Sequence, residues 1–268
     1  MRAPLSVIVI ARDEAQNIQP CLRSVMWADE RVVVVDEGST DDTAERARSC
    51  NAHVIVRRWE GFAEAKRFAV AQTSNEWVLW LDADERVTED LAEEIRTTLE
   101  TDPPFSAYRV PRRAYFLGKW IRHCGWYPGY VVRLFRKSKA RFNTLPVHEG
   151  LEVEGPVGTF HHDLLHYTDR DLQHYFRKLD RYTTLAATDL EAVGKRASAV
   201  DILLRPTAVF LKMYLLRAGF LDGMHGLVLS SLSACYVLAK YAKLWERTRV
   251  RRRRKGKGGV REGDGNAL

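Results

Sequence analysis

Three acidic side chains follow directly after a run of large apolar residues. The stretch WVLWLDADERV, residues 77–87, places Asp82, Asp84 and Glu85 at the end of an apparent buried strand. Two carboxylates on either side of the small Ala83 can face a hard divalent cation, which prefers oxygen ligands and often keeps waters and substrate phosphates in its shell. Such a cation can bridge a diphosphate and neutralise the charge that develops as it leaves. For an isolated pair of this kind, a solvated acidic turn that caps a helix is the alternative.

A second polar cluster follows another apolar run, RVVVVD at residues 31–36. Asp36 can accept hydrogen bonds from a base N–H and a ribose hydroxyl. Gly38 permits the backbone to approach a ligand closely. Residues 39–41 suit a turn that enters a helix, so helix capping is the alternative for part of this loop.

Two cations lie on a predicted helix between the second and fourth apolar runs. Lys66 and Arg67 belong to GFAEAKRFAVAQT, residues 61–73, which has apolar residues at helical spacing. A cation at this place could meet a phosphate. A solvated helix face is an equally good explanation for either residue alone.

The elements that must position these groups alternate between strand and helix. Short, continuously apolar runs predict strands at 5–11, 31–36, 52–56 and 76–82, and amphipathic patterns between and after them predict helices. This alternation is typical of an α/β fold with a mostly parallel sheet and helices on both faces. Ligands of such sheets bind beyond the carboxyl ends of the strands. The polar clusters at 12–14, 36–38 and 82–84 should therefore converge on one edge.

The rest of the chain has a different character. From about Pro103 the sequence is rich in aromatic residues and arginine, with the alternation of antiparallel strands, and a long helix should follow Thr168. Residues 199–246 are apolar but interrupted by charges. From Gly226 to Ala239 there are only fourteen uncharged residues. A spanning helix needs about 20 residues, so we expect helices that lie in a membrane interface. Packing on the catalytic domain or a homodimer interface is the alternative.

The charge of the chain belongs to its end. The formal net charge is +7, but the stretch 247–257 alone holds eight Lys and Arg and no acid, which leaves the body nearly neutral. This basic tail, 247–268, is expected to be disordered and to attract anionic lipids. A nucleic-acid-binding protein is the rival class. The tail lacks interleaved aromatic residues and the body offers no charged groove, so we expect no nucleic acid as partner.

The cysteines and the N-terminus favour the cytosol. The four cysteines are far apart and show no metal-ligand spacing. The N-terminal apolar run is short and is followed at once by charges, which is unlike a signal peptide. We therefore expect a cytoplasmic protein, peripheral on the cytoplasmic face of the inner membrane.

Four stretches together resemble, in order and spacing, the signature of glycosyltransferase family 2 on the GT-A fold. They are SVIVIARDEAQNI, VVVVDEGSTDDT, GFAEAKRFAV and WVLWLDADERV. Within the family, the likeness is to the lipopolysaccharide core β-glucosyltransferases that act on inner-core heptose. It continues through GWYPGYVVRLFRK, PVHEGL and AGFLDGMHGLVL, up to about Trp245.

The resemblance implies an inverting transfer of one sugar from a nucleotide-sugar, UDP-glucose or similar, to a lipopolysaccharide-core or other cell-envelope glycan. A polyprenyl-phosphate acceptor is the alternative. The implied cofactor is Mg²⁺ or Mn²⁺ at Asp82 and Asp84. The implied nucleotide-sugar site consists of Ala11, Arg12, Glu14, Asp36, Gly38, Lys66, Asp82, Ala83 and Asp84. Two loop residues, Glu37 and Asp42, depart from the usual Ser and Gly. The QxxRW motif of processive synthases is absent, which implies one sugar per encounter.

The expected organisation has three parts. A GT-A catalytic domain covers 1–170, with a nucleotide-sugar half (1–102) and an acceptor half (103–170). A helical, membrane-associated region covers 171–246, and the basic tail covers 247–268.

Inverting transfer also needs a base that takes the proton of the acceptor hydroxyl. Relatives often place an acid well downstream of the metal pair. Glu149, in the constrained turn LPVHEGL, is the candidate here, and His148 could orient it or the acceptor. The other acids considered are Glu152, Glu154 and Asp163.

Overall fold

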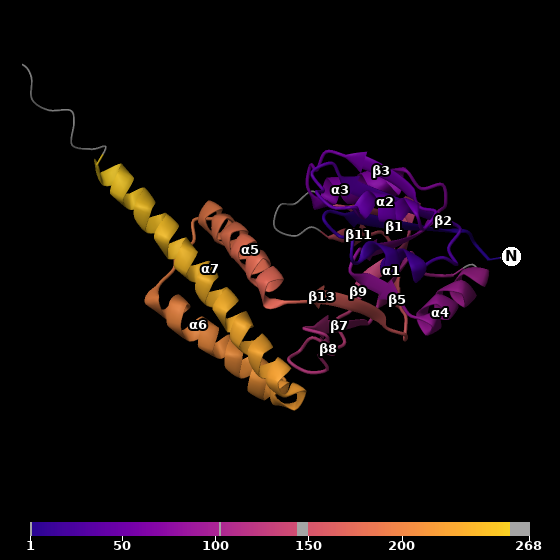
Figure 1. Ribbon diagram of the computed structural model, residues 1–268. Coiled ribbons are helices and arrows are strands. Elements are labelled where there is room, and N and C mark those ends of the chain that lie inside the picture. Colours follow the sequence, from indigo (N-terminus) through magenta and orange to yellow (C-terminus); the bar gives the residue numbers. More distant parts are fainter. Residues whose placement is uncertain (1, 102, 144–149, 258–268) are drawn as a thin grey trace, which may run out of the picture. The chain divides into compact units, whose positions relative to one another are not determined.

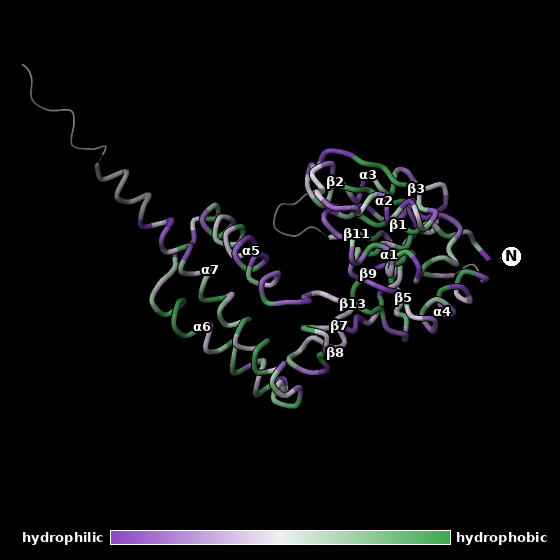
Figure 2. Tube along the Cα trace, in the orientation of Figure 1, coloured by the Kyte–Doolittle hydropathy of each residue, from purple (hydrophilic) through white to green (hydrophobic). Residues whose placement is uncertain are grey.

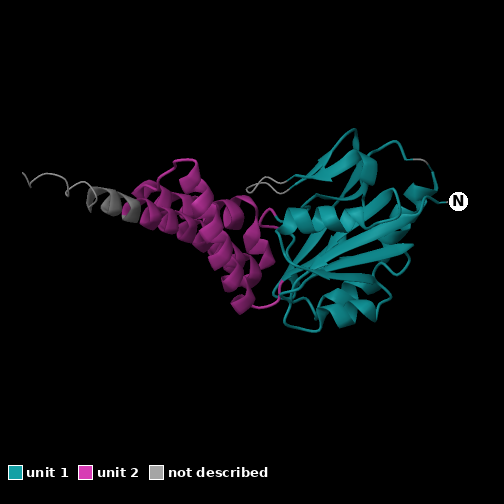
Figure 3. Cartoon of the chain, turned by 90° about the horizontal axis from the view of Figure 1, so that it is seen from above, with its two compact units in different colours: residues 1–122, 126–168 teal, residues 123–125, 169–268 magenta. Residues whose placement is uncertain are grey.

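The computed structural model describes residues 2–101, 103–143 and 150–257 (Figure 1). The chain forms two compact units, which Figure 3 colours separately. Unit 1 consists of Met1–Arg122 and Trp126–Thr168, and unit 2 consists of His123–Gly125 and Asp169–Leu268. The sequence analysis expected the catalytic domain to end at residue 170. It did not predict that the short segment His123–Gly125 belongs to the helical unit 2.

The expected α/β fold is confirmed in unit 1. Four parallel strands lie in the order β3-β2-β1-β4, with β1 between β2 and β4. Their bounds are Leu5–Ala11 (β1), Glu30–Asp36 (β2), His53–Arg57 (β3) and Trp77–Asp82 (β4). The intervening and following helices are Ile18–Arg23 (α1), Thr43–Arg48 (α2), Phe62–Ala71 (α3) and Glu89–Glu100 (α4).

The strands are apolar throughout because helices cover both faces of the sheet. Val7 and Val9 of β1 belong to the core shared with α1 and α4, whereas Ile8 and Ile10 belong to the core shared with α3. Successive strand residues point to opposite faces. Both sets are therefore buried, and the polar residues are left for the strand ends.

The remaining strands make the sheet mixed. β9 (Val131–Arg136) runs antiparallel between β4 and β6 (Ala107–Val110), and β12 (Val157–Thr159) pairs with β6 at the edge. A second sheet has the order β5-β13-β7-β8, with bounds Glu85–Val87 (β5), Leu164–Asp169 (β13), Arg112–Phe116 (β7) and Lys119–Trp120 (β8). A hairpin-like pair joins β10 (Ala140–Phe142) and β11 (Leu151–Val153), and η1 is Lys137–Lys139.

Unit 2 is helical. α5 (Leu172–Ala192) and α6 (Ala199–Leu211) both pack on the long α7 (Met224–Lys257), with the π-helical η2 (Lys212–Leu216) and the 3₁₀ turn η3 (Gly219–Asp222) between α6 and α7. The start of α7 lies very close to η3, because a Cβ at Gly226 would lie 1.8 Å from the carbonyl oxygen of Gly219.

The disorder expected from residue 247 onward is corrected in part. The basic stretch 247–257 is helical, as the last part of α7, and 258–268 lies outside the described residues. Among the described helices, Met224–Arg249 of α7 is long and apolar enough to cross a membrane by length and composition, which the interrupted charge pattern did not predict.

Glu94 on α4 holds the segment that leads into β13. Its carboxylate accepts hydrogen bonds from the backbone N–H groups of His161 and His162 at 3.0–3.1 Å. It also contacts the Nδ1 atoms of the two imidazoles at 3.0 and 2.9 Å. Burial raises the pKa of Glu94, but these hydrogen bonds outweigh burial, and the pKa lies below its usual value.

We expect Glu94→Gln to lower the free energy of unfolding by about 1–3 kcal/mol at neutral pH, since it loses charged hydrogen bonds. A lowered folded pKa gives stability that is present above the unfolded pKa and lost as pH falls through the folded one. The difference should thus shrink below about pH 4. Urea unfolding followed by tryptophan fluorescence measures it. Glu93→Gln, next to it and exposed, is the control, and equal midpoints for the two variants would contradict the prediction.

Candidate functional site

The loops after β1 and β2 are tied together at the carboxyl edge of the sheet. The Asp13 N–H donates to Ser39 Oγ at 3.0 Å, and the Thr40 N–H donates to Asp13 Oδ1 at 2.7 Å. The Glu14 N–H donates to Thr43 Oγ1 at 2.8 Å. The small polar residues of the second loop therefore fix the first loop, and this structural role accounts for several of them.

Asp36 lies at the end of β2 with its carboxylate buried. Oδ1 accepts a hydrogen bond from the Gly38 N–H at 3.0 Å, and Oδ2 lies 2.9 Å from Arg12 Nη1. A Cβ at Gly38 would lie 3.5 Å from Asp36 Oδ1 and 3.6 Å from Arg12 Nη2, so the glycine keeps this corner open. The structure thus brings Arg12, Asp36 and Gly38 together, as the sequence predicted.

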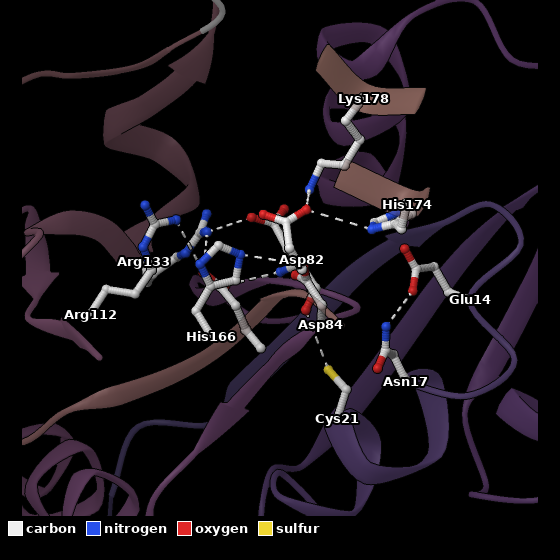
Figure 4. A network of polar contacts seen from close by, with 12 residues as sticks. Glu14, Asn17, Cys21, Asp82, Asp84, Arg112, Arg133, His166, His174 and Lys178 are labelled. Atoms are coloured by element: carbon white, nitrogen blue, oxygen red, sulfur yellow. Dashed lines mark hydrogen bonds and ion pairs between the residues drawn. The ribbon is translucent and has the colours of Figure 1, made fainter. Parts of the chain in front are cut away.

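The other residues expected on this edge lie on β1 and the loop after it. Ala11 is the buried last residue of β1. Glu14 follows it, and its Oε2 accepts a hydrogen bond from Asn17 Nδ2 at 2.7 Å (Figure 4).

The acids after β4 are held by an arginine that the sequence reasoning missed. Arg133 Nη2 of β9 donates to Asp82 Oδ2 and to Glu85 Oε1, each at 2.6 Å (Figure 4). Arg133 and Glu85 are almost fully buried, with side-chain exposures of 3% and 0%. The Asp82 N–H also donates to Glu85 Oε2 at 3.1 Å. Glu85 therefore has a structural role, while Asp82 is the more exposed of the two acids.

The cations set the ionisation of this cluster. Burial raises the pKa of Asp82, but the charges of Arg133 and Lys66 outweigh it and the pKa lies below its usual value. Burial raises the pKa of Glu85, against the charge of Arg133. Burial lowers the pKa of Arg133, but Asp82 and Glu85 outweigh it and the pKa rises. Asp82 is therefore a carboxylate at neutral pH.

Lys66 lies beside this cluster and Arg67 does not. The buried Lys66 has its Nζ 4.1 Å from the centre of the Trp80 ring, and the Arg133 guanidinium lies 4.1 Å from the centre of the same ring. Arg67 is exposed and pairs with Glu64 at 3.6 Å. The solvated-face explanation thus fits Arg67 and does not fit the buried Lys66.

Asp84 has an imidazole beside it. His166 Nε2 of β13 lies 3.3 Å from Asp84 Oδ2, and the Tyr167 N–H donates to the Asp84 carbonyl oxygen at 2.9 Å. The sequence reasoning missed His166 because it lies far along the chain, in an element that pairs with β5. Ala83, between the acids, is buried and leaves room for both carboxylates.

These side chains form a small donor set of oxygen and nitrogen atoms. Among the residues that the structure describes, no group of three or more His, Cys, Asp or Glu side chains is arranged to hold a metal ion. Asp82 and Asp84, the expected metal pair, supply only two carboxylates, so a cation there would take its other ligands from substrate phosphates and water, as Mg²⁺ usually does.

The two residues expected to act as catalytic base and its neighbour cannot be placed in the structure. Glu149 and His148 lie outside the described residues. Of the other acids, Glu152 pairs with Arg141 at 2.9 Å and Glu154 pairs with Lys139 at 3.8 Å, both near solvent.

Asp163 was the fallback candidate for the base, and both of its oxygens are engaged. Oδ2 accepts hydrogen bonds from Arg113 at 2.5 and 3.0 Å, and Oδ1 accepts one from the Tyr127 hydroxyl at 3.1 Å. The Asp163 carboxylate therefore links Arg113 of β7 to Tyr127, which is a structural role.

Comparison with known proteins agrees with this geometry. Residues 6–151 match the family model for glycosyl transferase family 2. The chain is 30% identical over 264 residues to the lipopolysaccharide core biosynthesis glycosyltransferase LpsC of Rhizobium meliloti (strain 1021), covering 94% of this chain and 96% of the relative. It is 28% identical over 251 residues to the uncharacterized glycosyltransferase RP128 of Rickettsia prowazekii (strain Madrid E), covering 90% and 86%.

A solved structure shares the fold. It is the mannosyltransferase PcManGT of Pyrobaculum calidifontis, in complex with GDP-Man and Mn²⁺. The TM-score is 0.53 at 17% identity, and the match covers 92% of this chain and 88% of that one.

Proposed function

This chain belongs to glycosyl transferase family 2, and we propose that it is an inverting enzyme that transfers one glucose-like sugar from a UDP-linked donor to a lipopolysaccharide-core or other cell-envelope glycan. The observation that carries the proposal is the meeting of Asp36 and the Asp82–Asp84 pair at the carboxyl edge of one parallel sheet. The name of the Rhizobium meliloti relative supports the class of acceptor. A polyprenyl-phosphate acceptor is the alternative.

The nucleoside of the donor binds at Asp36 in this proposal. Asp36 Oδ2 is a buried acceptor that faces Arg12 without a hydrogen-bond partner among the described residues. It can accept the base N–H or a ribose hydroxyl. Ala11, Glu14 and Gly38 form the neighbouring backbone, and Gly38 leaves the space that the nucleoside requires.

The diphosphate lies between Asp84 and Lys66 in this proposal. Mg²⁺ or Mn²⁺, held by Asp82 and Asp84, would neutralise the charge that develops on the departing diphosphate. His166 lies 3.3 Å from Asp84 Oδ2 and would orient that carboxylate. Arg133 keeps Asp82 ionised and fixed, and Lys66 places a further positive charge near the site. Glu149 takes the proton of the acceptor hydroxyl, with His148 as its orienting neighbour. The enzyme acts in the cytoplasm, peripheral on the inner membrane, as a monomer or homodimer.

Replacing Asp36 by Asn should weaken the binding of UDP about 10–100-fold, because the buried charge that faces Arg12 and the nucleoside is lost. Turnover at saturating donor should change little, since Asp36 does not touch the reacting centre. Calorimetry measures the affinity. Glu37→Gln, the exposed neighbour, is the matched control. Unchanged UDP affinity in Asp36→Asn with lower turnover would contradict this role.

The reaction itself is tested by product analysis. Purified protein is incubated with a panel of UDP- and GDP-sugars, a divalent metal and truncated lipopolysaccharide, and the new linkage is analysed by NMR. The proposal predicts a β-linked product from an α-linked UDP-sugar. Transfer with retention, or to polyprenyl phosphate alone, would refute it.

A further inference from the structure

The outward side of α6 and the turns after it is unusually apolar. Nine large apolar side chains between residues 200 and 224 are exposed, with exposed fractions from 44% to 82%. They are Val200, Leu203, Leu204, Leu211, Leu215, Leu216, Phe220, Leu221 and Met224, which we call the α6 face. Large contiguous apolar patches on a protein surface mark interaction sites.

The apolar residues of α6 are not confined to its less exposed side. Val200, Leu204, Leu211 and Leu215 recur at intervals of four and seven residues, so they share one side of the helix. The small residues between them on that side, at 207 and 208, are also exposed. The other side packs on α7. Large apolar side chains therefore lie on the exposed side of α6 as well as among its less exposed residues, such as Ile202, Val209 and Phe210. Figure 2 marks the hydrophobic residues along α6 in green.

The charges beside the α6 face are positive. Between residues 200 and 224 the sequence contains three cations, Arg205, Lys212 and Arg217, and two acids, Asp201 and Asp222. Asp222 is buried and accepts a hydrogen bond from the His123 N–H at 2.8 Å, and Asp201 pairs with Arg205 at 2.6 Å. The acids are therefore engaged, and the excess charge of the span is positive. The long stems of Lys and Arg can lie along an apolar surface while their charges reach phosphates. The stretch 247–257 adds eight positive charges to the same unit.

These positive charges favour a lipid surface over a second copy of the chain as the partner of the α6 face. A second copy of the chain would bring like charges against one another, whereas an anionic lipid surface would attract them. The geometry of an apolar helix face flanked by Lys and Arg is that of a helix lying in the plane of a bilayer. Insertion of the α6 face into a bilayer would not disturb the packing of α7 on α5 and α6.

We propose that the α6 face is the membrane-binding surface of this protein, lying in the interface of an anionic bilayer. The proposal specifies the surface behind the peripheral location given above, and it does not depend on the reaction. The occupant is a lipid surface rich in anionic headgroups.

The test compares two matched double variants of the full chain. Leu204→Glu/Leu211→Glu alters the face, and Phe176→Glu/Leu185→Glu alters equally exposed side chains of α5, which lies on another side of α7 (Figure 1). Binding to phosphatidylglycerol–phosphatidylcholine vesicles is measured by sedimentation, without donor or acceptor. We expect the α6 variant to bind at least about tenfold more weakly than wild type, and the α5 variant to bind as wild type. Equal loss in both, or no loss in the α6 variant, would overturn the proposal.

A second measurement does not depend on how the Glu variants fold. Of the four free cysteines only Cys235 is exposed, so a fluorophore is placed at Leu211→Cys or Leu185→Cys in a Cys235→Ala background. Spin-labelled lipids should quench the label at 211 and leave that at 185 bright. Equal quenching would overturn the assignment.

Two results with wild-type protein would also overturn it. One is binding to neutral vesicles as strong as binding to anionic ones, and the other is resistance to carbonate extraction, which is expected if α7 spans the membrane. A concentration-dependent dimer that the α6 variant abolishes while vesicle binding persists would assign the face to a second copy instead.

Discussion

We expect the replacement of Asp84 by Asn to lower the rate of sugar transfer by about 10²–10⁴-fold while leaving the fold intact. In the proposed site the variant loses an anionic oxygen at the metal, which would supply several kcal/mol of charge stabilisation, and each 1.36 kcal/mol corresponds to a factor of ten. The fold survives because the structural hydrogen bond of Asp84 uses its carbonyl oxygen, which accepts from the Tyr167 N–H at 2.9 Å. Initial rates with saturating UDP-sugar and metal measure the effect.

The control for this prediction is Asp90→Asn, which removes an exposed acid from the first turn of α4. It should transfer sugar as wild type does. Circular dichroism and thermal unfolding establish that both variants are folded. A folded Asp84→Asn protein with near-normal turnover would remove Asp84 from the metal site.

We expect the replacement of Arg133 by Met to destabilise unit 1 by about 3–5 kcal/mol, because the fully buried Glu85 loses the guanidinium that lies 2.6 Å from it. Glu85→Gln in the same chain removes the unpaired charge. The double variant Arg133→Met/Glu85→Gln should therefore recover most of the stability. It should remain impaired in transfer, since Asp82 has lost the group that holds it at 2.6 Å.

Arg133→Lys separates positioning from charge. An ammonium cannot hold two carboxylates in the planar geometry of a guanidinium, so we expect a folded protein with turnover lowered about 10–100-fold, as for other groups that orient metal ligands. Arg112→Met, which loses a half-exposed contact with Glu85 at 3.8 Å, is the control and should lose less than about 1 kcal/mol. Wild-type turnover in the double variant, or wild-type stability in Arg133→Met, would contradict this account.

The parallel half of the fold could be predicted because each of its strands has a recognisable pattern within a short stretch of sequence. β1 and β2 are apolar on both faces, and each ends at a polar turn, so the pattern gives the strand, its burial and its polar edge together. Thr88 precedes α4, and its side chain accepts a hydrogen bond from the Leu91 N–H, as is typical of a Thr at the start of a helix. Asp36 and the acidic pair followed from their positions at strand ends.

The rest depended on pairing between distant segments. The insertion of β9 between β4 and β6 decides which side chain meets Asp82, and alternation along β9 does not contain that information. A signal was nevertheless present, since Arg133 is a cation within the apolar run VVRLF, and a buried charge requires a partner. His166 within LLHYTD is a similar case, in a strand that pairs with β5.

In the C-terminal region the sequence predicted the helices but not which of their sides are exposed. Charges that interrupt an apolar sequence predicted helices at an interface, but the side of each helix that stays exposed depends on its neighbours. The packing of α6 on α7 covers one side of a largely apolar helix and leaves Val200, Leu204 and Leu211 exposed.

The central claim is that the edge formed by Asp36 and the Asp82–Asp84 pair binds a nucleoside diphosphate together with a divalent cation. Calorimetric titration of the full chain with UDP, with and without Mn²⁺, tests it most directly. The account predicts saturable binding of one UDP per chain that Mn²⁺ strengthens at least about tenfold, with the metal effect lost in Asp84→Asn and the nucleoside affinity lowered in Asp36→Asn. Absence of UDP and GDP binding in the presence of Mn²⁺, or binding that neither variant alters, would contradict it.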